Sequence, residues 1–127
     1  MAYQYYNPNP YGEHTIDCVI RAISKITNQS WDDTFLDIAA QAFFDKSMPT
    51  SDKVWGHYLM KRGFRRVTIP NACPYCYTVR DFAYVHPYGC YLLKTYEHVI
   101  ACCNGVYYDT FDSGDEIPIY YWERSAY

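Results

Sequence analysis

The pair Asn104-Gly105 constrains the fold more than any other feature of the sequence, because it lies between two short runs of β-branched and aromatic residues. Asparagine followed by glycine accepts the positive φ angles of a two-residue type I′ turn, so the flanking runs are predicted to form a β-hairpin. Such a turn also fixes the register of the two strands, and here it places Ile100 opposite Asp109.

The register of this hairpin decides which of its side chains share a face of the sheet. Side chains alternate along a strand, so His98 and Asp109 are predicted to be diagonal neighbours on one face, while Asp112 points to the other. The β-carbons of such neighbours lie about 6 to 8 Å apart, near enough for an imidazole N–H to reach a carboxylate. The hairpin therefore predicts that Asp109, rather than Asp112, contacts His98.

The remaining sequence divides into a helical first half and a strand-rich second half. Apolar residues recur at helical spacing in the first half, whereas short β-branched and aromatic runs follow later. We therefore predict an α+β fold with N-terminal helices packed on a C-terminal antiparallel sheet, in one domain spanning 1–127 with an extended arm over 1–14. Helices are expected over 18–28, 30–45, 51–62 and 78–84, and strands over 66–69, 91–95, 98–103, 106–111 and 117–122.

Composition excludes several classes of function. A chain of 127 residues, half of them apolar, is sized for one domain. Its net charge of −3 argues against a nucleic-acid partner. No stretch is long and apolar enough to span a membrane, and the first residues lack the positive start and apolar run of a signal peptide. We therefore expect a cytoplasmic protein without a membrane partner, whose six cysteines are thiols rather than a disulfide framework; its oligomeric state is left open.

Cys18 is the candidate nucleophile because it opens the first predicted helix, with Asp17 placed to cap the first turn. Unsatisfied N–H groups at a helix N-terminus stabilise a thiolate, which is the reactive form of cysteine. A histidine base and a carboxylate that orients it complete a hydrolytic centre. Cys18, His98 and Asp109 supply these three parts in the order Cys, His, Asp.

Two segments carry a resemblance to a known family. One is Asp17-Cys-Val-Ile-Arg-Ala22 at the start of a helix, and the other is His98-Val-Ile-Ala followed by Asn104-Gly-Val-Tyr-Tyr-Asp-Thr110. Together with the aromatic run Ile119-Tyr-Tyr-Trp122, they resemble the small papain-like cysteine-peptidase proteins found in bacteriophage and bacterial genomes.

The resemblance covers most of the chain and implies a papain-like fold with a catalytic triad at Cys18, His98 and Asp109. It implies a thiol hydrolase or acyl-transfer enzyme that acts on an amide or isopeptide bond of a peptide or protein substrate, in the host cytoplasm if a phage encodes it. This chemistry proceeds through an acyl-thioester and requires no cofactor and no metal.

One position departs from the family pattern. Papain-like enzymes usually carry a glutamine about six residues before the cysteine, where it completes the oxyanion hole, and this chain has Gly12 there. Loss of one such donor costs about 3 to 4 kcal/mol of transition-state stabilisation. Side chains of the N-terminal arm that can replace it are Gln4, Asn7, Asn9 and His14.

Three other interpretations compete with the hydrolase. The motif Cys73-Pro-Tyr-Cys76 has the interior seen in glutaredoxins, which indicates a thiol redox protein. The same pair can contribute to a zinc site, which needs four ligands. The third interpretation is a binding module that keeps the papain-like fold without its activity. Further zinc ligands would come from Cys90, Cys102, Cys103, His57 and His86.

Overall fold

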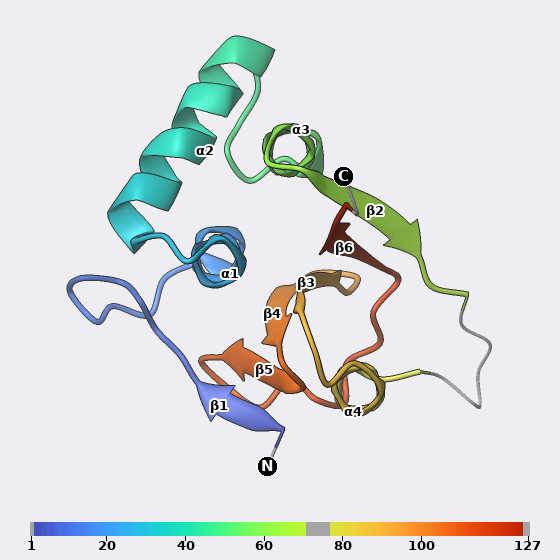
Figure 1. Ribbon diagram of the computed structural model, residues 1–127. Coiled ribbons are helices and arrows are strands. Elements are labelled where there is room, and N and C mark those ends of the chain that lie inside the picture. The colour runs from blue at the N-terminus through green and yellow to red at the C-terminus, as the bar shows by residue number, and fades with distance from the viewer. Residues whose placement is uncertain (1, 71–76, 126–127) are drawn as a thin grey trace.

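The computed structural model describes residues 2–70 and 77–125, and this part of the chain is a mixed α+β fold. Helices flank a six-stranded sheet whose strand order is β1-β5-β4-β3-β6-β2 (Figure 1). Cys73 and Cys76, on which the redox and zinc interpretations depend, lie outside the described residues.

The three helices of the first half are α1 (Cys18–Thr27), α2 (Trp31–Asp45) and α3 (Asp52–Lys61). The Ser30 hydroxyl accepts a hydrogen bond from the Asp33 backbone N–H at 3.0 Å, which caps α2 as its sequence predicts. Gly63 follows α3 with a φ of +87°, a conformation that glycine adopts without strain. A shorter helix, α4 (Val79–Val85), follows later in the chain.

Five strands pair antiparallel, in agreement with the sequence: β2 (Phe64–Thr68), β3 (Cys90–Lys94), β4 (Val99–Cys103), β5 (Val106–Asp109) and β6 (Tyr120–Arg124). The predicted hairpin is present between β4 and β5. Asn104 and Gly105 have φ angles of 52° and 78°. Cys102 pairs with Tyr107, which is the register that a two-residue turn requires.

The N-terminal arm corrects the prediction of a purely antiparallel sheet. Residues Tyr3–Tyr5 form β1, which pairs parallel with β5 at the edge of the sheet. Backbone hydrogen bonds at both ends secure this pairing, from Tyr107 N to Ala2 O and from Tyr6 N to Asp109 O, each 2.8 Å. The proline-rich part of the arm begins only after Tyr6, so the residues before it are free to extend and pair. The arm is thereby attached to the strand that ends in Asp109.

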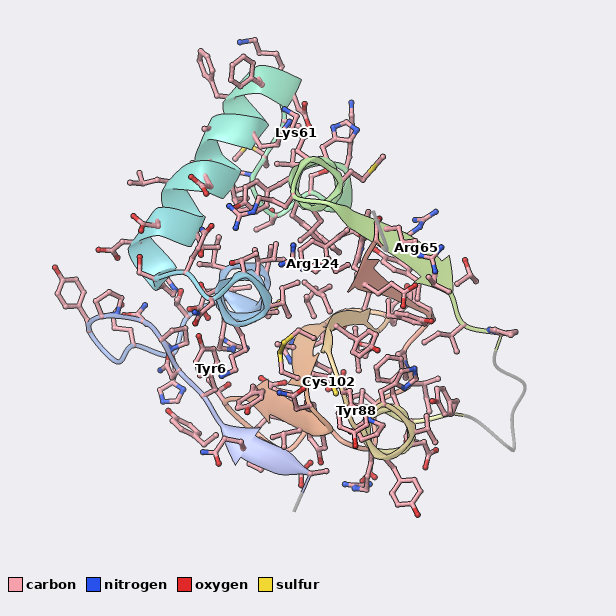
Figure 2. All side chains as sticks on the ribbon, in the orientation of Figure 1. Tyr6, Lys61, Arg65, Tyr88, Cys102 and Arg124 are labelled. Carbon is pink, nitrogen blue, oxygen red and sulfur yellow. A yellow bond between two sulfur atoms is a disulfide. The ribbon has the colours of Figure 1, made fainter. Side chains whose placement is uncertain are left out.

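Two apolar cores form on opposite faces of the sheet. The larger lies beneath α1, α2 and α3 and contains Ile23, Ile38 and Trp55, which are fully buried. The smaller lies between the sheet and α4 and contains Phe82 and Cys102, the latter labelled in Figure 2. Side-chain alternation along β4 therefore sends its neighbouring cysteines to different cores.

A disulfide between Cys90 and Cys103 corrects the prediction that all six cysteines are thiols (Figure 2). The two residues are directly paired across β3 and β4, with their Cα atoms 4.1 Å apart. The sequence does not reveal that two cysteines face each other across strands until the strand pairing is known. The prediction of free thiols was based only on the absence of an export signal. Among the described residues, Cys18 and Cys102 remain free thiols.

Within 2–70 and 77–125, no helix has both the length and the apolar character needed to cross a membrane.

Candidate active site

Cys18 and His98 meet at the junction between α1 and the sheet, as the sequence predicts. Cys18 is the first residue of α1 and is half-buried, while His98 directly precedes β4, against which α1 packs. Both side chains line the same two cavities, and each shifts the pKa of the other; the backbone N–H of Val99 also helps to lower the pKa of the Cys18 thiol. The candidate nucleophile and the candidate base thus come from the helical and the strand-rich halves of the chain.

The turn before β4 holds His98 in place. The backbone N–H of His98 donates to the Thr95 hydroxyl at 3.1 Å, and the Thr95 N–H donates to the His98 carbonyl at 2.9 Å. The Lys94 ammonium lies beneath this turn and donates to the carbonyls of Thr95 (2.6 Å) and Tyr96 (3.0 Å). The ring of Phe111 stacks on the imidazole with a centroid distance of 5.2 Å.

Asp109 is the carboxylate partner of His98, which confirms the prediction from the hairpin register. His98 Nε2 lies 2.6 Å from Asp109 Oδ2, so its Nδ1 is the ring nitrogen left for Cys18. Asp112 instead accepts a hydrogen bond from the Tyr107 hydroxyl on another part of the surface. Side-chain alternation along the strands thus predicted correctly which of the two aspartates contacts His98.

The Asp109 carboxylate is fully buried, and each of its oxygens has two partners. Oδ2 accepts from the Ser113 hydroxyl at 2.7 Å as well as from His98. Oδ1 accepts from the Thr110 backbone N–H at 2.8 Å and from Arg21 Nη2 at 3.1 Å. Burial raises the pKa of Asp109, but its bonds with His98, Ser113 and Thr110 outweigh burial and keep it below the usual value.

The electrostatics of the site favour a thiolate–imidazolium pair. Burial raises the pKa of Cys18, but the hydrogen bond and charge of His98, the Val99 N–H and the charge of Arg21 lower it more, so the net shift is downward. Burial likewise lowers the pKa of His98, yet Asp109 and Cys18 together raise it to about 9. The imidazole is therefore protonated at neutral pH, beside a thiol whose pKa is depressed.

Asp17 does not cap α1 with its side chain, contrary to the sequence prediction. Its carboxylate is turned to two other partners, namely Arg21 Nη1 at 2.5 Å and the indole Nε1 of Trp31 at 2.9 Å. Two strong donors, one of them charged, outcompete the backbone N–H groups of the first turn for this carboxylate. The backbone N–H groups in the first turn of α1, which begins at Cys18, therefore receive no hydrogen-bond acceptor from the Asp17 side chain.

Two cavities give access to the pair, and both are lined by Cys18 and His98. The first, of about 380 Å³, has a predominantly apolar wall that includes Ile16 and the stacked rings of Trp31 and Phe35, whose centroids are 5.2 Å apart. The second, of about 230 Å³, extends toward the N-terminal arm. The Cys18 side chain therefore borders two cavities that a ligand can enter.

Of the four arm residues predicted as replacements for the oxyanion glutamine, only His14 lines a cavity together with Cys18. The side-chain amides of Gln4 and Asn7 donate to arm carbonyls, of Tyr5 at 3.1 Å and of Glu13 at 3.2 Å. The Asn9 side chain accepts from a neighbouring backbone N–H within the arm. Of the four, His14 is thus the one whose side chain borders the cavity that Cys18 lines.

Sequence reasoning missed Arg21 and Ser113 as partners of Asp109. Arg21 had one visible signal, since it lies four residues after Asp17 on a helix face that is otherwise apolar. Ser113 had none, because its contact depends on the loop after β5. The described residues also hold no group of three or more His, Cys, Asp and Glu arranged to bind a metal ion.

Comparisons with protein-family models, with curated proteins and with solved structures found no match to this chain.

Proposed function

We propose that the protein is a papain-like thiol hydrolase or acyl-transfer enzyme, most simply a cysteine peptidase, that acts on an amide or isopeptide bond of a peptide or protein. The observation that carries the proposal is that Cys18 lines the same two cavities as His98, whose imidazole is hydrogen-bonded to the buried Asp109 carboxylate at 2.6 Å. The described residues contain two free cysteines, Cys18 and Cys102. Cys102 is buried, and its burial raises the pKa of its thiol to about 12.

The reaction follows from the charges of the pair. The Cys18 thiolate attacks the carbonyl carbon, a C–S bond forms, and the electron pair of the C=O bond moves to oxygen. As the tetrahedral intermediate collapses, the C–N bond breaks and His98 Nδ1 gives its proton to the leaving amine. Asp109 holds the ring through Nε2, so the same nitrogen faces the reacting atoms throughout.

The second half-reaction restores the enzyme. Neutral His98 takes a proton from water, or from an acceptor amine or alcohol, as that nucleophile attacks the Cys18 thioester carbonyl. The C–S bond then breaks and the thiolate–imidazolium pair is regenerated. Water gives hydrolysis, whereas an amine or alcohol gives acyl transfer.

A library of peptides derived from a whole proteome tests the proposal without knowledge of the substrate. We expect new peptide N-termini after incubation with the wild-type chain and none with Cys18→Ala, which removes only the sulfur. Cys102→Ala serves as the matched control and should cleave like the wild type. Identical peptide sets with wild type and Cys18→Ala would overturn the peptidase assignment and leave the inert papain-fold module.

The alternative redox function can be tested by a separate measurement, because it uses Cys73 and Cys76. If these residues cycle between dithiol and disulfide with glutathione and reduce a model disulfide at a rate unaffected by Cys18→Ala, the glutaredoxin-like function replaces the hydrolase.

A further inference from the structure

Arg21 is a buried cation that the proposed chemistry does not use. It lies three residues after Cys18 on α1, and its side chain is 7 % exposed. Nη1 lies 2.5 Å from Asp17 Oδ1 and Nη2 lies 3.1 Å from Asp109 Oδ1. One guanidinium therefore joins the helix of the nucleophile to the carboxylate that orients the base.

We propose that Arg21 is a positioning residue of the active site: it clamps Asp109 in the rotamer that faces His98 and offsets part of the buried negative charge beside Cys18. This inference rests on the proposed function, since it concerns the same Cys18–His98–Asp109 centre. It assigns to Arg21 a role in the chemistry in addition to its contribution to folding.

The clamp follows from the geometry of the Asp109 carboxylate. A carboxylate turns readily about its Cβ–Cγ bond, and a turn would exchange or withdraw the oxygen that meets His98 Nε2. Arg21 holds Oδ1 while His98 meets Oδ2, so a turn would break an ion pair whose two side chains are almost fully buried. The planar fork of arginine can serve two carboxylates at once, which the single ammonium of lysine cannot do with the same geometry.

The charge balance supports the same conclusion. Asp17, Asp109 and a Cys18 thiolate would place three negative charges together, and His98 alone would supply one positive charge. Arg21 adds the second, and its charge contributes to the depressed pKa of Cys18. Without Arg21, the surplus negative charge disfavours the thiolate, because like charges repel more strongly where water is scarce.

Further titratable groups of the described residues lie near Arg21 or on its helix. Tyr6 of the arm lies near enough for the Arg21 charge to oppose the upward shift of its pKa by burial. His14 and Glu97 line the cavity that Arg21 also lines. Lys25 lies one helical turn further along α1, where its ammonium is 4.2 Å from the centre of the Tyr108 ring.

A purely structural role for Arg21 is the competing explanation, and it makes a different prediction. An ion pair that only fastens α1 to β5 would lower the free energy of unfolding when removed, but would leave the pH dependence of the folded Cys18 thiol unchanged. The pH profile of thiol reactivity therefore separates the two roles.

The experiment measures the rate of Cys18 alkylation by iodoacetamide from pH 4 to pH 10 on the full chain, resolved by mass for each cysteine. In Arg21→Met we expect the acid limb to move to higher pH, with alkylation about tenfold slower at acid pH and no difference at high pH. Arg21→Lys, which keeps the charge and loses the fork, should lie nearer to wild type than Arg21→Met. Lys25→Met removes a charge from the same helix and should leave the profile unchanged.

Each outcome decides the question. A profile of Arg21→Met that superimposes on the wild type overturns the clamp, even if the variant is less stable. If Arg21→Met does not fold, Arg21→Gln replaces it with the same expectation, because it also removes the charge while its amide can still donate a hydrogen bond to a carboxylate. If Cys18 is alkylated at the same rate in wild type and in His98→Ala, the proposed function itself fails. If His98→Ala slows the alkylation and only the effect of Arg21→Met is missing, the clamp alone fails.

Discussion

At the scale of single residues, the site depends on which aspartate meets His98. Asp109 and Asp112 are three residues apart, yet one is fully buried against the imidazole and the other accepts from Tyr107 near the surface. A carboxylate that contacts the ring stabilises the imidazolium, and through it the Cys18 thiolate. The two aspartates therefore form a natural matched pair for mutation.

Asp109→Asn should slow the alkylation of Cys18 at neutral pH by about tenfold, because the neutral amide supports the imidazolium less well than a carboxylate does. Asp112→Asn removes the same charge three residues later in the chain and should leave the rate unchanged. Mass-resolved alkylation of both variants makes the comparison. Equal effects, or a larger effect for Asp112→Asn, would contradict the pairing.

The raised pKa of His98 also makes stability depend on pH. The pKa lies near 6.5 in the unfolded chain and about 9 in the folded one, so the folded state binds the proton more tightly. The resulting stabilisation is fully present below pH 6.5 and is lost as the pH rises from there through about 9. Urea unfolding of wild type and His98→Gln across this range should show their difference shrink by about 2 kcal/mol. A difference that stays constant would contradict the proton linkage.

At the scale of secondary-structure elements, the β4–β5 hairpin could be predicted almost completely from the sequence. Asn104-Gly105 determines the turn type, the turn determines the register, and the register brings His98 and Asp109 together. Helix α2 was similarly predictable, because Ser30 signals its start locally. These features depend on residues that are close in the sequence.

Other elements could not be predicted, because they depend on pairings between distant segments. The parallel pairing of β1 with β5 joins residues about a hundred positions apart, and the Cys90–Cys103 disulfide depends on the register of β3 and β4. The Arg21–Asp109 ion pair spans 88 positions. Local patterns carry no information on such contacts until the strand order is known.

Gly105→Ala tests the turn on which the hairpin argument depends. At its φ of +78° a Cβ would be strained, and it would also lie 3.4 Å from the Ala83 carbonyl oxygen. We expect the free energy of unfolding to fall by about 1 to 2 kcal/mol. Gly63→Ala, at a φ of +87° with nothing within 4 Å of its Cβ, carries the strain without the contact and should lose no more. Thermal and urea unfolding measure both, and an unchanged stability of Gly105→Ala would contradict a type I′ turn.

At the scale of the whole molecule, the candidate site lies where the two halves of the chain meet. The helical half contributes Cys18 and Arg21 from α1, and the strand-rich half contributes His98, directly before β4, and Asp109, the last residue of β5. Helix α1 lies beside β4 in Figure 1. Packing of α1 on β4 buries the larger core and, at the same end, brings the thiol to the imidazole. Formation of the site is thus a consequence of correct packing between the halves.

Mass-resolved alkylation at neutral pH, in wild type and in His98→Ala, tests this account most directly. Cys18 should react faster than every other cysteine of the chain, because it combines a helix N-terminus, access to two cavities and a histidine partner. His98→Ala should slow Cys18 alone, and the buried Cys102 should stay unreactive in both proteins. If Cys73 or Cys76 reacts first and His98→Ala leaves Cys18 unchanged, the account of a Cys18–His98 hydrolytic centre is wrong.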